Sequence, residues 1–253
     1  HAQYGTVTGL VAILATDRPV VISFRGSDLL TWRSTPRTLL ARLLSQLSAA
    51  RATRLVCVAT HLRDALWWGR ERVTVIPTGV DLDKFAPRDR SAARRELGWP
   101  ESAPIVVFNG SRDPRIKRLD LAESVVAAAR REFPDLVFDV LDGHQDPESI
   151  PTRFAAADCL LLTSRYEGSP NVVKEALAMN LPVVAVDVGD VRERLAGVAP
   201  SFVCQDGADD LAARLAEVLR GGGARSNGRT AVESLSLART TDALVQVYGE
   251  VLG

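Results

Sequence analysis

Short aliphatic runs recur along this chain and alternate with longer stretches whose apolar residues return every three or four positions. The aliphatic runs predict strands at residues 20–24, 55–59, 73–76, 105–108, 136–141, 159–163 and 182–186. The longer stretches predict helices at residues 36–50, 61–68, 117–131, 170–179 and 208–220. Because strands that alternate with helices form parallel sheets covered by helices, the pattern predicts a doubly wound α/β fold.

The alternation is interrupted between residues 77 and 104, where proline, glycine and aspartate surround one short polar helix pattern. We interpret this stretch as a linker between two α/β domains. The predicted domains are residues 1–84 and residues 85–232. A helical segment at 233–253 follows three consecutive glycines and closes the chain, either by itself or by returning to the first domain.

Composition narrows the class of protein. The 253 residues include 31 basic and 31 acidic side chains, and a chain without net charge is a poor general binder of nucleic acid. No apolar run approaches the roughly 20 residues that span a bilayer, and no secretory pattern precedes the first strand. Cys57, Cys159 and Cys204 each lie in an apolar run without metal-ligand spacing. We therefore expect a cytoplasmic protein with reduced core cysteines.

The segment 167–178 combines two carboxylates with a helix start directly after a predicted strand. Ser169 followed by Pro170 is typical of a helix cap and a first helical residue. Backbone N–H groups at such a start bind phosphate, aided by the positive end of the helix dipole. Glu175 lies later on the same helix, within reach of a ribose, and Glu167 is expected to face a sugar. The segment predicts a nucleotide-sugar site.

Three ordered segments carry a family resemblance. They are the Glu-x7-Glu element 167–175, the stretch 75–81, and Asn-Gly-Ser-Arg at 109–112 with Lys117 after it. Together they resemble the retaining glycosyltransferases of the GT-B fold in glycosyltransferase family 4. The second segment departs from the family at Thr78, where asparagine is more usual.

The resemblance implies two Rossmann-like domains that face a cleft, with a UDP-, GDP- or ADP-sugar donor bound by the second. It assigns catalytic roles to Arg112, Lys117 and Glu167. It assigns the donor-binding residues Gly110, Gly168, Ser169, Pro170, Asn171, Val172 and Glu175. The guanidinium fork of Arg112 and the compact charge of Lys117 suit a leaving diphosphate, so we expect neither a metal ion nor another cofactor.

The resemblance also implies that the chain starts inside its first, acceptor-side domain, because family members have two domains of similar size. A half sheet exposes an unpaired edge and apolar surface, so we expect the chain to associate. In the segment 24–28, Arg25 stands where the family usually has histidine. Arginine is not a base near pH 7, so Arg25 is expected to grip an anionic acceptor or a phosphate.

Several alternatives stay open from the sequence. The acceptor is a glycan, a lipid or a small molecule, and bacterial surface polysaccharide assembly is the commonest setting of such relatives. The basic residues Arg33, Arg37, Arg42, Arg51 and Arg54 fit either a solvated face or peripheral contact with the inner face of a membrane. Other functions that fit are a donor-binding module without turnover and another GT-B enzyme, such as a sugar-nucleotide epimerase.

Each site residue also has a plainer interpretation. Glu167 and Glu175 are then two solvated charges, and Arg112 and Lys117 form an exposed basic turn. The spacing leaves Arg115 or Arg118 as substitutes for either cation. His144 is then a surface turn residue rather than a neighbour of the nucleotide.

Overall fold

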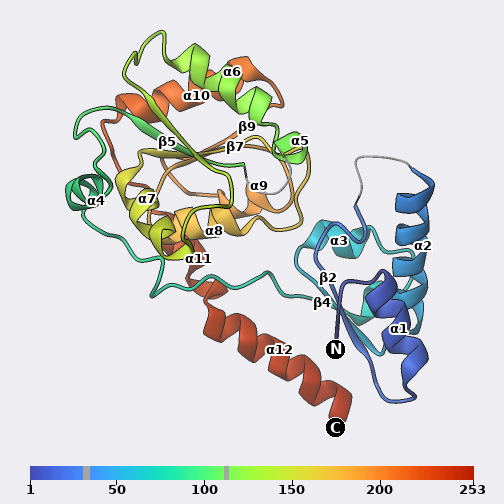
Figure 1. Cartoon of the computed structure of the whole chain (residues 1–253). Coiled ribbons are helices and arrows are strands. Elements are labelled where there is room, and N and C mark those ends of the chain that lie inside the picture. Colours follow the sequence, from blue (N-terminus) through green and yellow to red (C-terminus); the bar gives the residue numbers. More distant parts are fainter. Residues whose placement is uncertain (31–34, 111–113) are drawn as a thin grey trace. The chain divides into compact units, whose positions relative to one another are not determined.

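The computed structural model describes residues 1–30, 35–110 and 114–253, and the chain divides into two compact units (Figure 1). Unit 1 comprises His1–Gly79, Tyr166–Ser169 and Leu237–Gly253. Unit 2 comprises Val80–Arg165 and Pro170–Ser236. Each unit is built on its own parallel sheet, which confirms the predicted fold class.

Unit 1 holds a four-stranded sheet in the order β1-β2-β3-β4. Its strands are β1 (Ala2–Gln3), β2 (Val21–Phe24), β3 (Arg54–Cys57) and β4 (Val73–Val75). Its helices are α1 (Val7–Ala15), α2 (Pro36–Arg51), α3 (Thr60–Asp64), the 3-10 turn η1 (Arg70–Arg72) and α12 (Leu237–Leu252). Alternate strand residues bury opposite faces of the sheet: Ile22 and Leu55 belong to one cluster, and Val21 and Val56 to the cluster that receives Val247 of α12.

Helix α2 begins with a capping box, because the Thr35 hydroxyl accepts the Thr38 N–H while the Thr38 hydroxyl accepts the Thr35 N–H. Its buried face is small and partly polar: Ser45, Gln46, Ser48 and Ala49. This face allows close approach of α1, since a Cβ on Gly9 would lie 3.2 Å from the Ser48 Cβ. The leucines of α2 are therefore turned outward: Leu39, Leu40, Leu43 and Leu47 are all exposed.

A tight turn between β1 and α1 depends on a glycine. A Cβ built on Gly5 would lie 2.1 Å from Cε1 of the fully buried Phe24 ring. We expect Gly5→Ala to lower the free energy of unfolding of unit 1 by at least about 1 kcal/mol, the scale of an overpacked core. Thermal unfolding followed by circular dichroism measures this. Gly249→Ala in α12 is the matched control, because its Cβ would meet no atom within 4 Å; equal stability of the two variants would contradict the prediction.

Unit 2 holds a five-stranded sheet in the order β6-β5-β7-β8-β9. Its strands are β5 (Ile105–Asn109), β6 (Val137–Leu141), β7 (Cys159–Leu162), β8 (Val183–Val186) and β9 (Phe202–Cys204). Its helices are α4 (Arg90–Leu97), α5 (Pro114–Lys117), α6 (Leu119–Ala129), α7 (Ile150–Ala156), α8 (Asn171–Ala178), α9 (Val191–Arg194), α10 (Ala208–Arg220) and α11 (Gly228–Val232). Two 3-10 turns complete it, η2 (Pro147–Ser149) and η3 (Glu233–Leu235).

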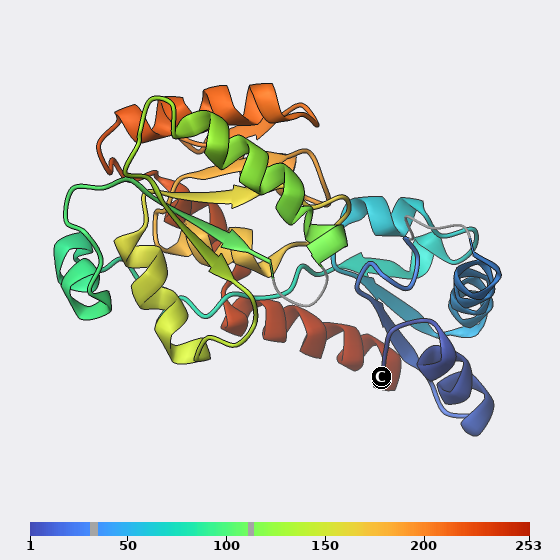
Figure 2. The same cartoon turned by 45° about the horizontal axis from the view of Figure 1, so that its top comes forward.

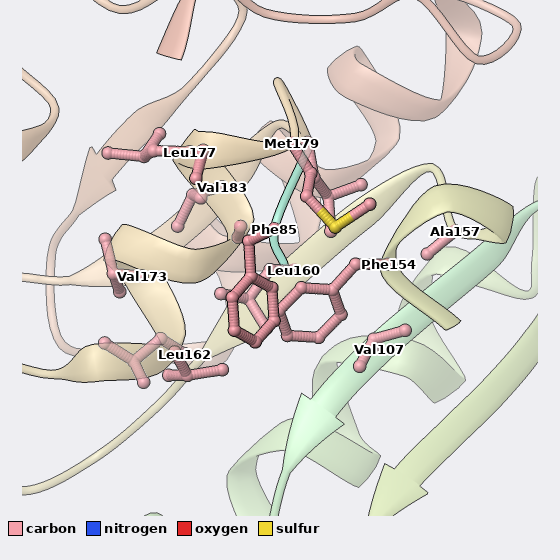
Figure 3. Close-up of a cluster of buried hydrophobic side chains, with 14 of the residues drawn as sticks. Phe85, Val107, Phe154, Ala157, Leu160, Leu162, Val173, Leu177, Met179 and Val183 are labelled. Carbon is pink, nitrogen blue, oxygen red and sulfur yellow. The ribbon is translucent and has the colours of Figure 1, made fainter. Parts of the chain in front are cut away.

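Helices cover both faces of the unit 2 sheet, with α6 and α10 on one face and α7, α8 and α11 on the other (Figures 1 and 2). The aliphatic strands are consequently buried on both sides. Val106 and Leu161 point to the α6 and α10 face. Val107 and Leu160 point to the other, where Phe154 packs with Phe85 and with Val173, Leu177 and Met179 around α8 (Figure 3).

The three cysteines lie in these cores, as the sequence predicts, and all are free. Burial raises the pKa of the Cys57 and Cys204 thiols to about 12 and that of Cys159 as well. They are therefore protonated at neutral pH and do not serve as nucleophiles.

No helix within the described ranges is both long and apolar enough to cross a bilayer.

A buried arginine joins α4 to the core of unit 2. Arg94 is fully buried and donates to the Asp158 carboxylate at 2.9 Å and to the carbonyl oxygens of Ala156, Pro100, Glu101 and Ala103. Asp158 also accepts the Ile105 N–H at 2.7 Å and pairs with Arg90 at 2.6 Å. The polar pattern in the predicted linker is thus the anchor of a helix, not a free spacer.

Two predicted helices have the wrong bounds, and several short elements were not predicted. The helix predicted at 61–68 ends at Asp64, because the Gln46 amide of α2 binds the Ala65 carbonyl and the Trp67 N–H. The helix predicted at 117–131 is broken at Arg118, whose φ of 57° lies in the left-handed region. The short strands β1 and β9 and the helices α1, α7 and α9 were not predicted, since their runs are too short or too uniformly apolar to show a period.

Candidate functional site

The candidate site lies where the strand order of the unit 2 sheet reverses. Strand β6 lies on one side of β5, and the chain then crosses back to place β7 on the other side. In an open parallel sheet, helices leave the carboxyl ends of neighbouring strands in opposite directions at such a point, and ligands bind in the resulting crevice. The carboxyl ends of β5 and β7 lead into Asn109-Gly110 and into the loop before α8.

A cavity of about 150 Å³ opens at this point. Its apolar lining comes from Leu141, Ile150, Phe154 and Val172. Its polar lining comes from Asn109 at the end of β5, Gly143 and Gln145 in the loop after β6, and Glu175 on α8. An apolar floor with a few convergent polar groups is the usual form of a small-molecule site. We call it the Glu175 cavity.

Glu175 is only half-buried, yet burial raises the pKa of its carboxyl above the usual value. The positive charges of Lys174 and Lys84 oppose this rise. Lys84 is held nearby by an ion pair with Glu148 at 2.6 Å, and Lys174 is fully buried. A carboxylate that keeps a desolvation penalty inside a cavity is suited to accept hydrogen bonds from ligand hydroxyl groups, which relieve that penalty.

Lys117 is the last residue of α5 and is half-buried. The loop after β7 is tied to this helix end: the Thr163 hydroxyl donates to the Lys117 carbonyl at 2.7 Å, and the Arg165 N–H donates to the Ile116 carbonyl at 2.8 Å. These bonds hold Lys117 beside the carboxyl end of β7. Arg118, a suggested substitute, pairs with Asp206, whereas Arg112 lies outside the described residues.

The Glu-x7-Glu element is divided between the two units. The segment Tyr166–Ser169, with the half-buried Glu167 and the buried Gly168, groups with unit 1. Pro170 and the residues of α8 belong to unit 2.

The predicted start of α8 needs correction. Ser169 is not its cap, and Pro170 is not its first helical residue. Pro170 itself is the N-cap, with an extended ψ of 116°, and no side chain caps the helix. Asn171 is the exposed first residue, and Val172, one residue later, turns into the Glu175 cavity.

Of the predicted donor-binding residues, Val172 and Glu175 line the Glu175 cavity. Gly110 is buried beside it and has a packing role, because a Cβ there would lie 3.1 Å from Val140. Asn109 belongs to the family-like segment 109–112 but has no predicted role there, and neither Gln145 nor Phe154 is among the predicted site residues. Asn109 ends β5 and Gln145 follows β6, and a polar residue after a predicted strand is a sequence signal for a ligand site. Phe154 has no such signal, because it reaches the cavity only when α7 packs on the sheet.

The loop after β6 contributes through its backbone turn. His144 has a side chain that is 90% exposed and does not line the Glu175 cavity. Its neighbour Gln145 does line it, and the Gln145 side-chain oxygen accepts the Gly143 N–H at 3.2 Å.

A second, larger cavity of about 630 Å³ follows the carboxyl ends of β7, β8 and β9 and contains the ion pair of Arg192 with Asp187.

Comparison with known families gives a match for each half of the chain. Residues 1–84 match the family described as Glycosyltransferase Family 4, and residues 140–221 match the one described as Glycosyl transferases group 1. The second match contains β7, α8 and the lining residues Gln145, Phe154 and Glu175.

Curated relatives share a substantial part of the sequence. The D-inositol 3-phosphate glycosyltransferase of Geodermatophilus obscurus is 32% identical over 241 residues, which cover 79% of this chain and 53% of the relative. The protein of the same name from Nocardia farcinica is 30% identical over 221 residues, which cover 72% of this chain and 48% of the relative. The chain therefore spans about half the length of the curated relatives it matches.

Solved structures share the fold. Sucrose-phosphate synthase from Thermosynechococcus elongatus aligns with a TM-score of 0.83 at 19% identity, covering 99% of this chain and 72% of the other. Anabaena HepE, solved in complex with UDP and glucose, aligns with a TM-score of 0.77 at 18% identity, covering 96% and 74%. With family matches over residues 1–84 and 140–221 and two parallel-sheet units of this type, the chain belongs to glycosyltransferase family 4 and has the GT-B fold.

Proposed function

We propose that this chain acts in the transfer of a sugar from a nucleotide-sugar donor to an acceptor, with retention of anomeric configuration and without a metal ion. The observation that carries the proposal is the Glu175 cavity, a half-buried carboxylate at the switch point of a parallel sheet. In other doubly wound folds an acidic side chain binds the ribose hydroxyls of the nucleotide. The Anabaena HepE structures, solved with UDP and glucose, with UDP, or with UDP-glucose, support the donor class.

The donor is proposed to bind with its ribose at Glu175 and its phosphates toward the first turn of α8 and Lys117. The N–H groups of Asn171 and Val172 open that helix, where the dipole favours an anion. Lys117, together with Arg112 of the family motif, supplies positive charge for the leaving diphosphate. Gly168, Ser169 and Pro170 are proposed to shape the approach to the phosphates, and Glu167 to contact the sugar.

The proposed reaction is a front-face displacement. The acceptor oxygen bonds to the anomeric carbon while the bond from that carbon to the diphosphate oxygen breaks, and the acceptor proton passes to the departing phosphate oxygen. Charge then grows on the diphosphate, where fixed cations stabilise it more than they stabilise the bound donor. This route needs no second carboxylate as nucleophile, unlike the double displacement of retaining glycosidases.

The test is direct binding. Calorimetry and thermal shift of the chain with UDP, GDP and ADP, each with and without common sugars, should show one preferred nucleotide. Incubation of the preferred donor with acceptors then separates the outcomes: transfer supports the proposal, binding without transfer or hydrolysis indicates a binding module, and interconversion of the free sugar nucleotide indicates an epimerase. A folded chain that binds none of the nucleotides contradicts the donor site.

Lys117→Ala separates transition-state stabilisation from simple donor binding. We expect the transfer rate to fall on the order of tenfold, equivalent to about 1.4 kcal/mol, with a smaller change in donor affinity. The reason is that the ammonium acts on charge that develops only as the bond breaks. Single-turnover rates and donor affinity by calorimetry are the measurements, with Arg192→Ala as a surface control. A loss of donor affinity with an unchanged single-turnover rate at saturating donor would make Lys117 a donor-binding residue only.

A further inference from the structure

Unit 1 contains its own polar cavity, separate in sequence from the Glu175 cavity. It has a volume of about 150 Å³ and lies at the carboxyl ends of β2, β3 and β4, next to the start of α12. The polar side chains that line it are His1, Gln3, Ser23, Arg25, Thr78, Thr240 and Thr241. We call it the Arg25 cavity.

The charge in the lining of this cavity is positive. Arg25 lines it, and no aspartate or glutamate does so among the described residues. The carboxylate tied to this loop, Asp28, is buried and accepts the backbone N–H groups of Gly5, Arg25 and Gly26 at 2.9 to 3.2 Å. Asp28 therefore shapes the loop that carries Arg25 but does not pair with the Arg25 side chain in the described structure.

A series of hydrogen bonds between side chains fixes the position of Arg25. The Arg25 Nε donates to the Gln3 Oε1 at 2.8 Å, and the Gln3 amide lies 3.4 Å from the His1 ring. That ring in turn contacts Ser23 at 2.8 Å and the Tyr248 hydroxyl of α12. Because Nε is engaged, the guanidinium plane is oriented, and its terminal nitrogens have no carboxylate partner within the described part of the chain.

Size limits what the cavity can hold. Sites for whole drug-sized ligands are about 300–1,000 Å³, so 150 Å³ suits a single functional group rather than a complete acceptor. The Ser23 hydroxyl contacts the His1 ring and the Thr240 hydroxyl donates to the Leu237 carbonyl, whereas the Thr241 hydroxyl can donate to an oxygen of such a group. A fixed guanidinium fork beside the Thr241 hydroxyl, with no carboxylate in the lining among the described residues, suits an oxyanion.

We propose that the Arg25 cavity binds the anionic group of the acceptor, a phosphate or a carboxylate, and so selects acidic acceptors. This inference rests on the proposed function, since it names the acceptor class of the same transfer. An arginine at this position gives the site a permanent positive charge that a neutral acceptor would leave unpaired. Discrimination against neutral analogues is then expected to be large.

The experiment uses inorganic phosphate and acetate as probes on the full chain saturated with its preferred nucleotide, so that donor phosphate contacts are already occupied. Binding is followed by NMR of arginine Nε–H groups and by calorimetry. We expect Arg25→Gln to weaken binding of the preferred anion at least tenfold and Arg25→Lys to weaken it less. Arg63→Gln is the control: Arg63 is a half-buried arginine of unit 1 that pairs with Asp64 and does not line the Arg25 cavity, so binding should be unchanged.

Three results would overturn the inference: no binding of either anion to the wild-type chain, equal binding by Arg25→Gln, or an equal loss in the Arg63→Gln control. A preference for phosphate over acetate, or the reverse, identifies the group. Failure of nucleotide binding in the same samples would instead count against the proposed function, so the two failures are distinguishable. Thermal unfolding of each variant shows that the fold is kept, which the exposed position of Arg25 favours.

Discussion

Glu175→Ala is expected to weaken nucleotide binding by about 1.5–3 kcal/mol, or about 10- to 150-fold, because it removes a charged acceptor of hydrogen bonds. The side chain lines the Glu175 cavity, where ribose hydroxyls replace the water that burial has removed. Calorimetry with the preferred nucleotide measures the loss. Unchanged affinity would remove the ribose role of Glu175.

Glu175→Gln keeps the shape of the side chain and isolates its charge. Burial raises the pKa of Glu175 in the folded state above its unfolded value. The folded state therefore binds more protons between these two values, and the free energy of unfolding falls as the pH rises through the raised pKa. Removing the charge should make the chain more stable at neutral pH while nucleotide affinity falls. A purely structural glutamate would instead lose stability on substitution.

The same pKa direction predicts how binding depends on pH. Ribose hydroxyls donate to the ionised carboxylate, so nucleotide affinity should decline as the pH is lowered through the raised pKa of Glu175. The wild-type profile is measured by calorimetry across mildly acidic pH. Glu175→Gln should lack this dependence, and a profile that is the same in both proteins would assign the titration to another group.

Arg94→Met is expected to give the largest loss of stability, about 3–5 kcal/mol, because it leaves the Asp158 carboxylate buried with a weakened set of partners. Arg94 is fully buried and Asp158 is 4% exposed. Four backbone carbonyls also lose their donor, including that of Ala156 at the end of α7. Chemical denaturation of the full chain, followed by circular dichroism, reports the change.

Two comparisons sharpen this prediction. Arg192→Met removes a surface pair in which Arg192 is 69% and Asp187 47% exposed, and should change stability by less than about 1 kcal/mol. The double variant Arg94→Met, Asp158→Leu should recover part of the loss, since it removes both buried charges. A small effect of Arg94→Met alone would mean that Arg90, which pairs with Asp158 at 2.6 Å, suffices to compensate its charge.

The sequence by itself determined the class of fold. Aliphatic runs at β2, β5, β7 and β8 are buried on both sheet faces, and this requirement leaves the same signature wherever parallel strands lie under two helix layers. The range of α10 was predicted to the residue, because its polar and apolar faces follow the helical period throughout. The Glu-x7-Glu spacing also placed Glu175 on the helix that follows β7.

Only the tertiary structure decided the composition of the two cavities. Phe154 and Asn109 lie 45 positions apart and meet at the Glu175 cavity because the chain crosses from β6 on one side of β5 to β7 on the other. The guanidinium plane of Arg25 is oriented by Gln3, which in turn contacts His1. The Lys117 backbone is held by the hydroxyl of Thr163, which follows β7. Local sequence patterns indicate which residues are buried and whether a segment has the period of a helix or of a strand. Long-range hydrogen bonds and strand order depend instead on contacts that no single segment contains.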